Sequence, residues 1–81
     1  MRIDKFLKVS RILKRRTVAQ EAAKEGKVIV NGKEAKPATQ IKAGDIVEIE
    51  YTTNRIKLRI LNVSEVVKKA DASGLYEIIT E

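Results

Sequence analysis

Small and apolar positions near the start of the chain recur with the spacing of an α-helix. On a helix with 3.6 residues per turn they share one face, and they are Ile3, Phe6, Leu7, Ser10 and Leu13. Lys14 would also fall on that face, where a charge is unfavourable. We therefore expect the first helix to span residues 3–13, with residues 14–16 connecting it to the next element.

A second helix is predicted over residues 17–25. Thr17 and Gln20 have the spacing of a capping box, in which each side chain bonds to the backbone N–H of the other residue. Gly26 then suits the left-handed cap that ends many helices, because glycine tolerates a positive φ. The side chains expected to face inward are Val18, Ala19, Ala22 and Ala23.

Beyond Gly26 the pattern changes to the two-residue alternation of β-strands. Asn31 and Gly32 both tolerate positive φ and predict a type I′ hairpin turn. The predicted strands span 28–31, 33–36, 46–51 and 55–61. Residues 64–74 are expected to form a polar, poorly ordered connection. Residues 75–80 fit either a last strand or a frayed helix, and we favour the strand.

These elements predict an α+β fold in which two N-terminal helices pack on a small, mostly antiparallel sheet. The length of 81 residues allows one domain over residues 1–81, and a monomer is expected. In the predicted hairpin of strands 46–51 and 55–61, acidic side chains lie on the outer face of one strand and basic side chains on that of the other. Cross-strand ion pairs are therefore predicted between Glu48 and Glu50 on one strand and Arg55, Lys57 and Arg59 on the other.

Composition excludes several classes of function. The chain contains neither histidine nor cysteine, so the usual transition-metal ligands and the usual general base near neutral pH are both missing. We therefore expect no metal, no cofactor and no catalytic activity. No apolar run approaches the ~18 residues that a membrane span requires. The expected compartment is the cytoplasm, with no membrane partner.

Positive charge is concentrated in the first 36 residues. That segment carries eleven Lys or Arg against four acids, for a net charge of +7, whereas residues 37–81 carry six basic and seven acidic residues, for a net charge of −1; the chain as a whole is +6. Charge segregated in this way creates a local positive field, whose natural partner is a polyanion. The few aromatic residues argue against a base-stacking platform for single strands and favour structured RNA.

The candidate RNA-binding face extends over both helices and the first hairpin. Its residues are Arg2, Asp4, Lys5, Lys8, Arg11, Arg15, Arg16, Thr17, Gln20, Lys24, Lys27, Asn31 and Lys33. For an isolated residue such as Lys24, a solubilising role on an exposed helix is the simpler interpretation. Asp4 either stabilises the start of its helix or orients a nearby arginine such as Arg16. Asn31 is either a turn former or an RNA ligand.

Several short motifs occur in the order typical of the ribosomal protein S4 type of RNA-binding domain. They are Arg2-Ile3-Asp4-Lys5-Phe6-Leu7, Arg15-Arg16-Thr17 before a helix that contains Ala19, Gly26-Lys27-Val28-Ile29-Val30-Asn31-Gly32, Pro37, and Gly44-Asp45. The chain resembles this family over about residues 1–51, the motif core, followed by strands and a tail over 52–81. Because the domain stands alone, it is similar to the heat-shock-protein-fifteen group and to its branch in ribosome-associated quality control.

That resemblance implies an alpha-L-like RNA-binding fold and a function without catalysis. It implies binding to large-subunit rRNA and to peptidyl-tRNA on split large ribosomal subunits. It also implies association with a tRNA-recruiting quality-control factor that extends stalled chains without a template. The resemblance places one RNA contact at Arg16. The expected location is accordingly cytoplasmic and ribosome-associated.

Three other classes of protein share parts of this pattern. The same domain is appended to pseudouridine synthases and tyrosyl-tRNA synthetases, but we expect no enzyme fragment, because the chain starts at Met1 and its predicted elements form a complete fold. A DNA-binding helix-turn-helix protein would share two basic helices but not the hairpin motif that follows them. A membrane-surface helix over residues 3–13 would have a suitable apolar face, but the sheet needs that face as cover.

Overall fold

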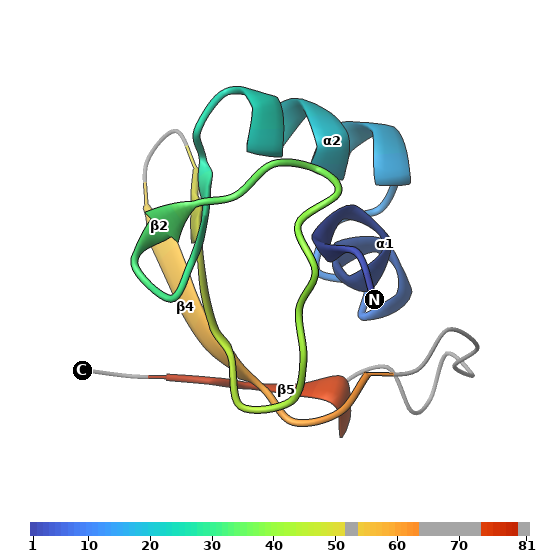
Figure 1. The fold of residues 1–81 in the computed structure, drawn as a ribbon, viewed down its shortest axis with the longest axis vertical. Coiled ribbons are helices and arrows are strands. Elements are labelled where there is room, and N and C mark those ends of the chain that lie inside the picture. The colour runs from blue at the N-terminus through green and yellow to red at the C-terminus, as the bar shows by residue number, and fades with distance from the viewer. Residues whose placement is uncertain (52–53, 64–73, 80–81) are drawn as a thin grey trace.

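The protein consists of two short helices packed against one side of an antiparallel sheet (Figure 1). The structure is a computed structural model that describes residues 1–51, 54–63 and 74–79. Its elements are α1 (Ile3–Val9), α2 (Arg16–Lys24), β1 (Val28–Val30), β2 (Lys33–Glu34), β3 (Ile46–Glu50), β4 (Arg55–Ile60) and β5 (Tyr76–Ile78). The strand order is β2-β1-β3-β4-β5, and every pairing is antiparallel. The predicted α+β class is therefore confirmed.

Helix α1 ends four residues earlier than predicted. After Val9 the chain turns at Ser10, and Arg11 adopts a left-handed conformation with φ of 62°. The N–H of Leu13 then bonds to the carbonyl oxygen of Leu7 at 3.0 Å, which folds the segment back onto the helix. A left-handed arginine costs about 1–2 kcal/mol locally, and no glycine marks the stop. The sequence therefore contained no signal for this end.

Helix α2 begins at Arg16 and not at Thr17, so the predicted capping box is wrong. Arg15 occupies the N-cap position and makes no side-chain cap bond, while Thr17 lies inside the helix. The predicted C-terminal cap is confirmed, because Gly26 has φ of 76° and its N–H bonds to Ala23. The N–H of the next residue, Lys27, bonds to Ala22 at 2.9 Å and completes the capping motif.

The first hairpin has the predicted two-residue turn, with φ of 52° at Asn31 and 83° at Gly32. Strand β2 is shorter than predicted and ends at Glu34, because the N–H of Lys36 turns to bond the hydroxyl of Thr39. The last strand, β5, confirms the choice of strand over helix near the C-terminus. Of the predicted connection over 64–74, residues 64–73 lie outside the described residues.

Cross-strand ion pairs join β4 to its two neighbours, β3 and β5, in a pattern partly different from that predicted. Arg55 pairs with Glu50 at 2.6 Å, as expected for neighbours at the β3–β4 hairpin. Arg59 instead pairs with Glu77 of β5 at 2.7 Å, because β5 lies beside β4 on its other edge. In the register of β3 and β4, Lys57 lies opposite Glu48.

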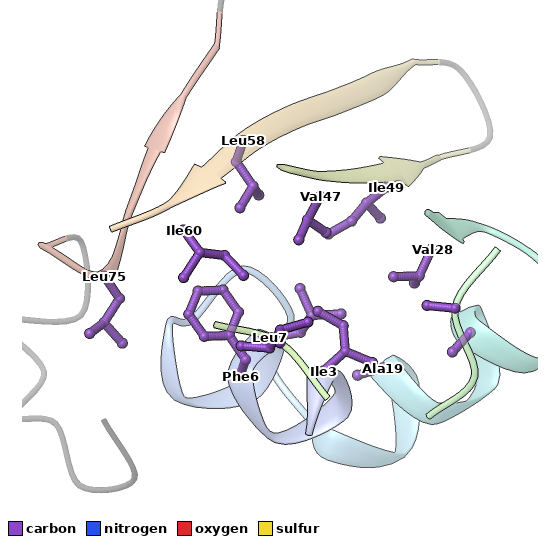
Figure 2. Packing of buried hydrophobic residues seen from close by; sticks show 13 residues of the cluster. Ile3, Phe6, Leu7, Ala19, Val28, Val47, Ile49, Leu58, Ile60 and Leu75 are labelled. Carbon is purple, nitrogen blue, oxygen red and sulfur yellow. The ribbon is translucent and has the colours of Figure 1, made fainter. Parts of the chain in front are cut away.

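The core lies between the two helices and the inner face of the sheet (Figure 2). Phe6 and Leu7 from α1 are fully buried and face strand residues such as Ile60 and Val47 (Figure 2). Ala19 of α2 is also fully buried, and its small side chain lets the two helices approach closely. Val18 was predicted to face inward like Ala19, but its side chain is 43% exposed at the surface of α2.

Candidate RNA-binding surface

A buried carboxylate organises the basic residues at the meeting point of the two helices. One oxygen of Asp4, Oδ2, accepts from Arg2 Nη2 at 3.1 Å, from Arg16 Nε at 3.2 Å and from Gln20 Nε2 at 3.0 Å. Its other oxygen, Oδ1, accepts from the backbone N–H of Lys5 at 2.8 Å. Asp4 is fully buried, whereas the two arginine side chains are 43% and 42% exposed. The carboxylate therefore holds two guanidinium groups at the surface.

The same contacts keep Asp4 ionised. Burial by itself would raise the pKa of Asp4, because it disfavours the charged form. Hydrogen bonds from Gln20, Arg16 and the N–H of Lys5, together with the charge of Arg16, outweigh burial and hold the pKa below its usual value. Of the two roles left open for Asp4, the geometry supports the orientation of Arg16 directly.

Arg2 is positioned by a loop distant in sequence. The N–H of Ile3 bonds to the carbonyl oxygen of Thr39 at 2.8 Å, and Arg2 forms an isolated antiparallel bridge with Gln40. The loop between β2 and β3 thus clamps the chain on both sides of Arg2. Hydrophobic periodicity carries no information about such a contact, so this anchor of Arg2 was not predictable from the sequence pattern.

Helix α2 extends the basic surface away from Asp4. Arg16, Gln20 and Lys24 are spaced four residues apart, so they form one stripe along the helix. Lys24 also shares a cleft of about 400 Å³ with Lys36, a residue that the sequence analysis did not select. Lys36 follows β2 in the chain, and only the packing of this segment beside α2 brings its charge to the stripe.

The remaining candidates fall into two groups. Five lie on or beside the helices; Lys5 is half-buried and the others are exposed, and they are Lys5, Lys8, Arg11, Arg15 and Thr17. Because Arg11 has left α1 and is left-handed, it does not continue the helical face of Lys8 that a longer helix would have provided.

The structure does not bring the other three candidates to this surface. Lys27 pairs with Glu25 at 2.9 Å and borders a different groove. Both polar atoms of the Asn31 amide are used internally, since Nδ2 donates to Asp45 and Oδ1 accepts from the N–H of Ile46. These contacts support the turn-forming role of Asn31. Lys33 lies on β2, at the edge of the sheet opposite to α1 and β5 (Figure 1).

Other kinds of site find little support in the described part of the chain. Among residues 1–51, 54–63 and 74–79, no three acidic, histidine or cysteine side chains gather where a metal ion could be held. In the same ranges no helix is long and apolar enough to cross a bilayer. The apolar face of α1, which would suit a membrane surface, is buried under the sheet.

Two helices hold surface arginines against a buried carboxylate, and a hairpin and an antiparallel sheet follow them in the chain. This combination defines a class of protein. Residues 1–47 match the S4 domain family. The heat shock protein 15 of Vibrio cholerae, described as trimeric, superposes with a TM-score of 0.89 at 28% identity, over 98% of this chain and 81% of that one. The chain belongs to the S4 domain family and is an RNA-binding protein of that class.

Two relatives within the family are similar over the full length of this chain. An RQC P-site tRNA stabilizing factor of Streptococcus pneumoniae is 51% identical over 81 residues, which is 100% of this chain and 92% of the relative. The factor of the same name from Bacillus subtilis is 38% identical, covering 100% and 94% respectively. At this identity and coverage, the chain is a member of the same group as these stabilizing factors.

Proposed function

We propose that the chain is a non-catalytic RNA-binding factor of ribosome-associated quality control. In this proposal it binds large-subunit rRNA and the P-site tRNA of large subunits that still carry peptidyl-tRNA. The observation that carries the proposal is the Asp4-centred cluster, which fixes Arg2 and Arg16 at the surface of a chain 51% identical to a P-site tRNA stabilizing factor. The names of the relatives describe stabilization of a tRNA and no chemical reaction.

The geometry explains how such a surface binds RNA. A guanidinium is planar, and its free N–H groups can form paired hydrogen bonds to a phosphate. Since Asp4 uses Arg16 Nε, the two terminal nitrogens of Arg16 are left for a ligand. A side chain already held in place loses less entropy on binding than a free one. Flanking lysines then add long-range attraction to the phosphate backbone.

Finer parts of the proposal concern partners and location. We place the protein in the cytoplasm on the large ribosomal subunit, next to a tRNA-recruiting quality-control factor. We also expect a monomer, although the Vibrio cholerae relative is described as trimeric. Sedimentation equilibrium of the purified chain at micromolar concentration tests the monomer, and a mass of three copies would contradict it.

The alternative functions have weaker support. An enzyme module would be expected to match only part of larger relatives, whereas this chain covers 92% of the Streptococcus pneumoniae factor. A DNA-binding protein of the helix-turn-helix class would share the helix pair, but here the pair is followed by the β1–β2 hairpin and residues 1–47 match the S4 domain family.

Co-sedimentation with large subunits carrying peptidyl-tRNA tests the proposal. Arg16→Ala should reduce bound protein at least tenfold, because it removes a preorganised phosphate contact worth about 1.5–3 kcal/mol. Arg55→Ala is the matched control, since Arg55 is a half-exposed arginine paired with one carboxylate on the distant β3–β4 hairpin. Circular dichroism should show both variants folded. A folded Arg16→Ala variant that binds like the parent would remove Arg16 from the site.

A further inference from the structure

Helix α2 exposes two stripes of opposite character. The basic stripe holds Arg16 and Lys24, on either side of Gln20. A second stripe consists of Val18, Glu21, Ala22 and Glu25. At about 100° per residue, the centres of the two stripes lie roughly 150° apart around the helix. An RNA bound along the first stripe therefore leaves the second exposed.

The second stripe forms one wall of a groove whose other wall is the end of β3. We call this the acidic groove; its volume is about 250 Å³. Its apolar lining includes Val18, Ala22, Ile49 and Tyr51, and its acidic side chains are Glu21, Glu25 and Glu50. Val18 and Tyr51 are 43% and 37% exposed, and they are two of the four large apolar residues classed as exposed in the described part of the chain. These two exposed side chains lie on facing walls of the groove, so an apolar group placed between them would cover both.

The charge of the groove is opposite to that of the whole molecule. Its ionisable lining residues are three glutamates and Lys27, for a net charge of −2 in a chain of +6. Lys27 neutralises Glu25 at 2.9 Å, and Arg55 reaches Glu50 from outside at 2.6 Å. Among the residues that the structure describes, Glu21 has no ion-pair partner. A polyanion is repelled here, and a cationic group is attracted.

We propose that the acidic groove docks a segment of another protein that carries one large apolar side chain flanked by lysine or arginine. The apolar side chain enters between Val18 and Tyr51, and a flanking cation lies next to Glu21, because Glu25 and Glu50 are already paired within the chain. Because the groove is small, binding is weak and transient, with a dissociation constant on the order of 10–1,000 µM. This proposal rests on the proposed function at one point only, the assignment of RNA to the basic stripe of α2.

Nuclear magnetic resonance of the full-length, ¹⁵N-labelled protein tests this proposal. The probe is a synthetic five-residue peptide with a central leucine between two pairs of lysines, and its control has serine in place of leucine. The leucine peptide should shift the backbone amides of Val18, Ala22 and Ile49 in a saturable manner. The serine peptide should bind at least tenfold more weakly, because it keeps the charge but not the apolar group.

Two variants separate the groove from general charge effects. Val18→Lys should weaken binding of the leucine peptide at least tenfold. Ile78→Lys is the matched control, because Ile78 is also an exposed apolar residue, at 52%, but lies on β5 outside the groove. Neither variant should change co-sedimentation with large subunits. If Arg16→Ala failed to reduce ribosome binding, the proposed function would fail while this peptide result would stand.

Several outcomes would overturn the docking proposal. Equal affinity for the serine and leucine peptides would show simple charge attraction. Shifts confined to the Arg16–Lys24 stripe, or no saturable binding up to millimolar peptide, would exclude the groove as the site. Concentration-dependent self-association that Val18→Lys abolishes would make a second copy of the chain the occupant.

Discussion

At the scale of the residue, Asp4 combines structural and functional roles. It is a fully buried carboxylate that accepts four hydrogen bonds, two of them from surface arginines. A buried charge is tolerated only when such partners compensate its desolvation. The position therefore links the stability of the helix pair to the orientation of the RNA-binding side chains.

Asp4→Asn should destabilise the protein by about 1–3 kcal/mol at pH 7, because it removes the charge that Gln20 and the arginines solvate. The folded pKa of Asp4 lies below its unfolded value, so the stabilisation is present above pH ~4 and is lost as the pH falls through the folded pKa. Urea unfolding of the parent and of Asp4→Asn between pH 2.5 and 7 measures the difference in their free energy of unfolding. The stability difference should shrink on acidification; a constant difference would contradict the assignment.

Asp4→Arg should reduce binding to large subunits at least as much as Arg16→Ala. The new positive charge repels Arg2 and Arg16 from their fixed positions, even though it raises the net charge. Co-sedimentation measures the binding, and Gln40→Arg, which adds charge at an exposed site beside Arg2, serves as the control. Tighter binding by folded Asp4→Arg would mean that total charge, and not orientation, governs affinity.

At the scale of the element, the end of α2 depends on a left-handed glycine. A Cβ at Gly26, whose φ is 76°, would approach Glu34 Oε1 to 2.9 Å, but this is the far end of a flexible side chain that can move. Gly26→Ala should therefore destabilise the protein by about 1–2 kcal/mol, mainly through backbone strain.

Gly32→Ala is the matched comparison for this prediction. Gly32 has φ of 83°, and a Cβ there would meet nothing within 4 Å, so strain alone acts. The two substitutions should agree within about 1 kcal/mol in chemical denaturation. A much larger cost at Gly26 would show that Glu34 is held rigidly against α2.

At the scale of the whole molecule, charge asymmetry is expected to control affinity for RNA. Binding to large-subunit RNA should weaken as salt increases, because each neutralised phosphate releases counterions. Arg11→Glu should weaken binding and lower the salt slope by about 1, since it removes one phosphate contact. Lys57→Glu, in the near-neutral half of the chain, should change the RNA affinity and the salt slope much less.

Filter binding at several salt concentrations measures both quantities. The two variants have the same net charge, so a difference between them reports position on the surface. Equal losses for Arg11→Glu and Lys57→Glu would place the RNA-binding face elsewhere or spread it over the whole molecule.

The sequence by itself determined the features that depend on neighbouring residues. The two helical segments, the turn at Asn31 and Gly32, the cap at Gly26 and the strand alternation of β3 and β4 were all predictable. Each rests on backbone hydrogen bonds or φ preferences within a few positions. Charge segregation and the motifs of the S4 family were equally visible, because they are linear properties of the chain.

Only the tertiary structure decided how the site is assembled. Gln20 bonds to Asp4, 16 residues away, and not to Thr17, so a long-range contact replaced the predicted local cap. The early end of α1 at a left-handed Arg11 has no local signal either. The anchoring of Arg2 by the loop near Thr39 and the placement of Val18 in the acidic groove depend on packing between elements. Periodicity describes which residues share a face of one element, whereas packing determines which faces meet.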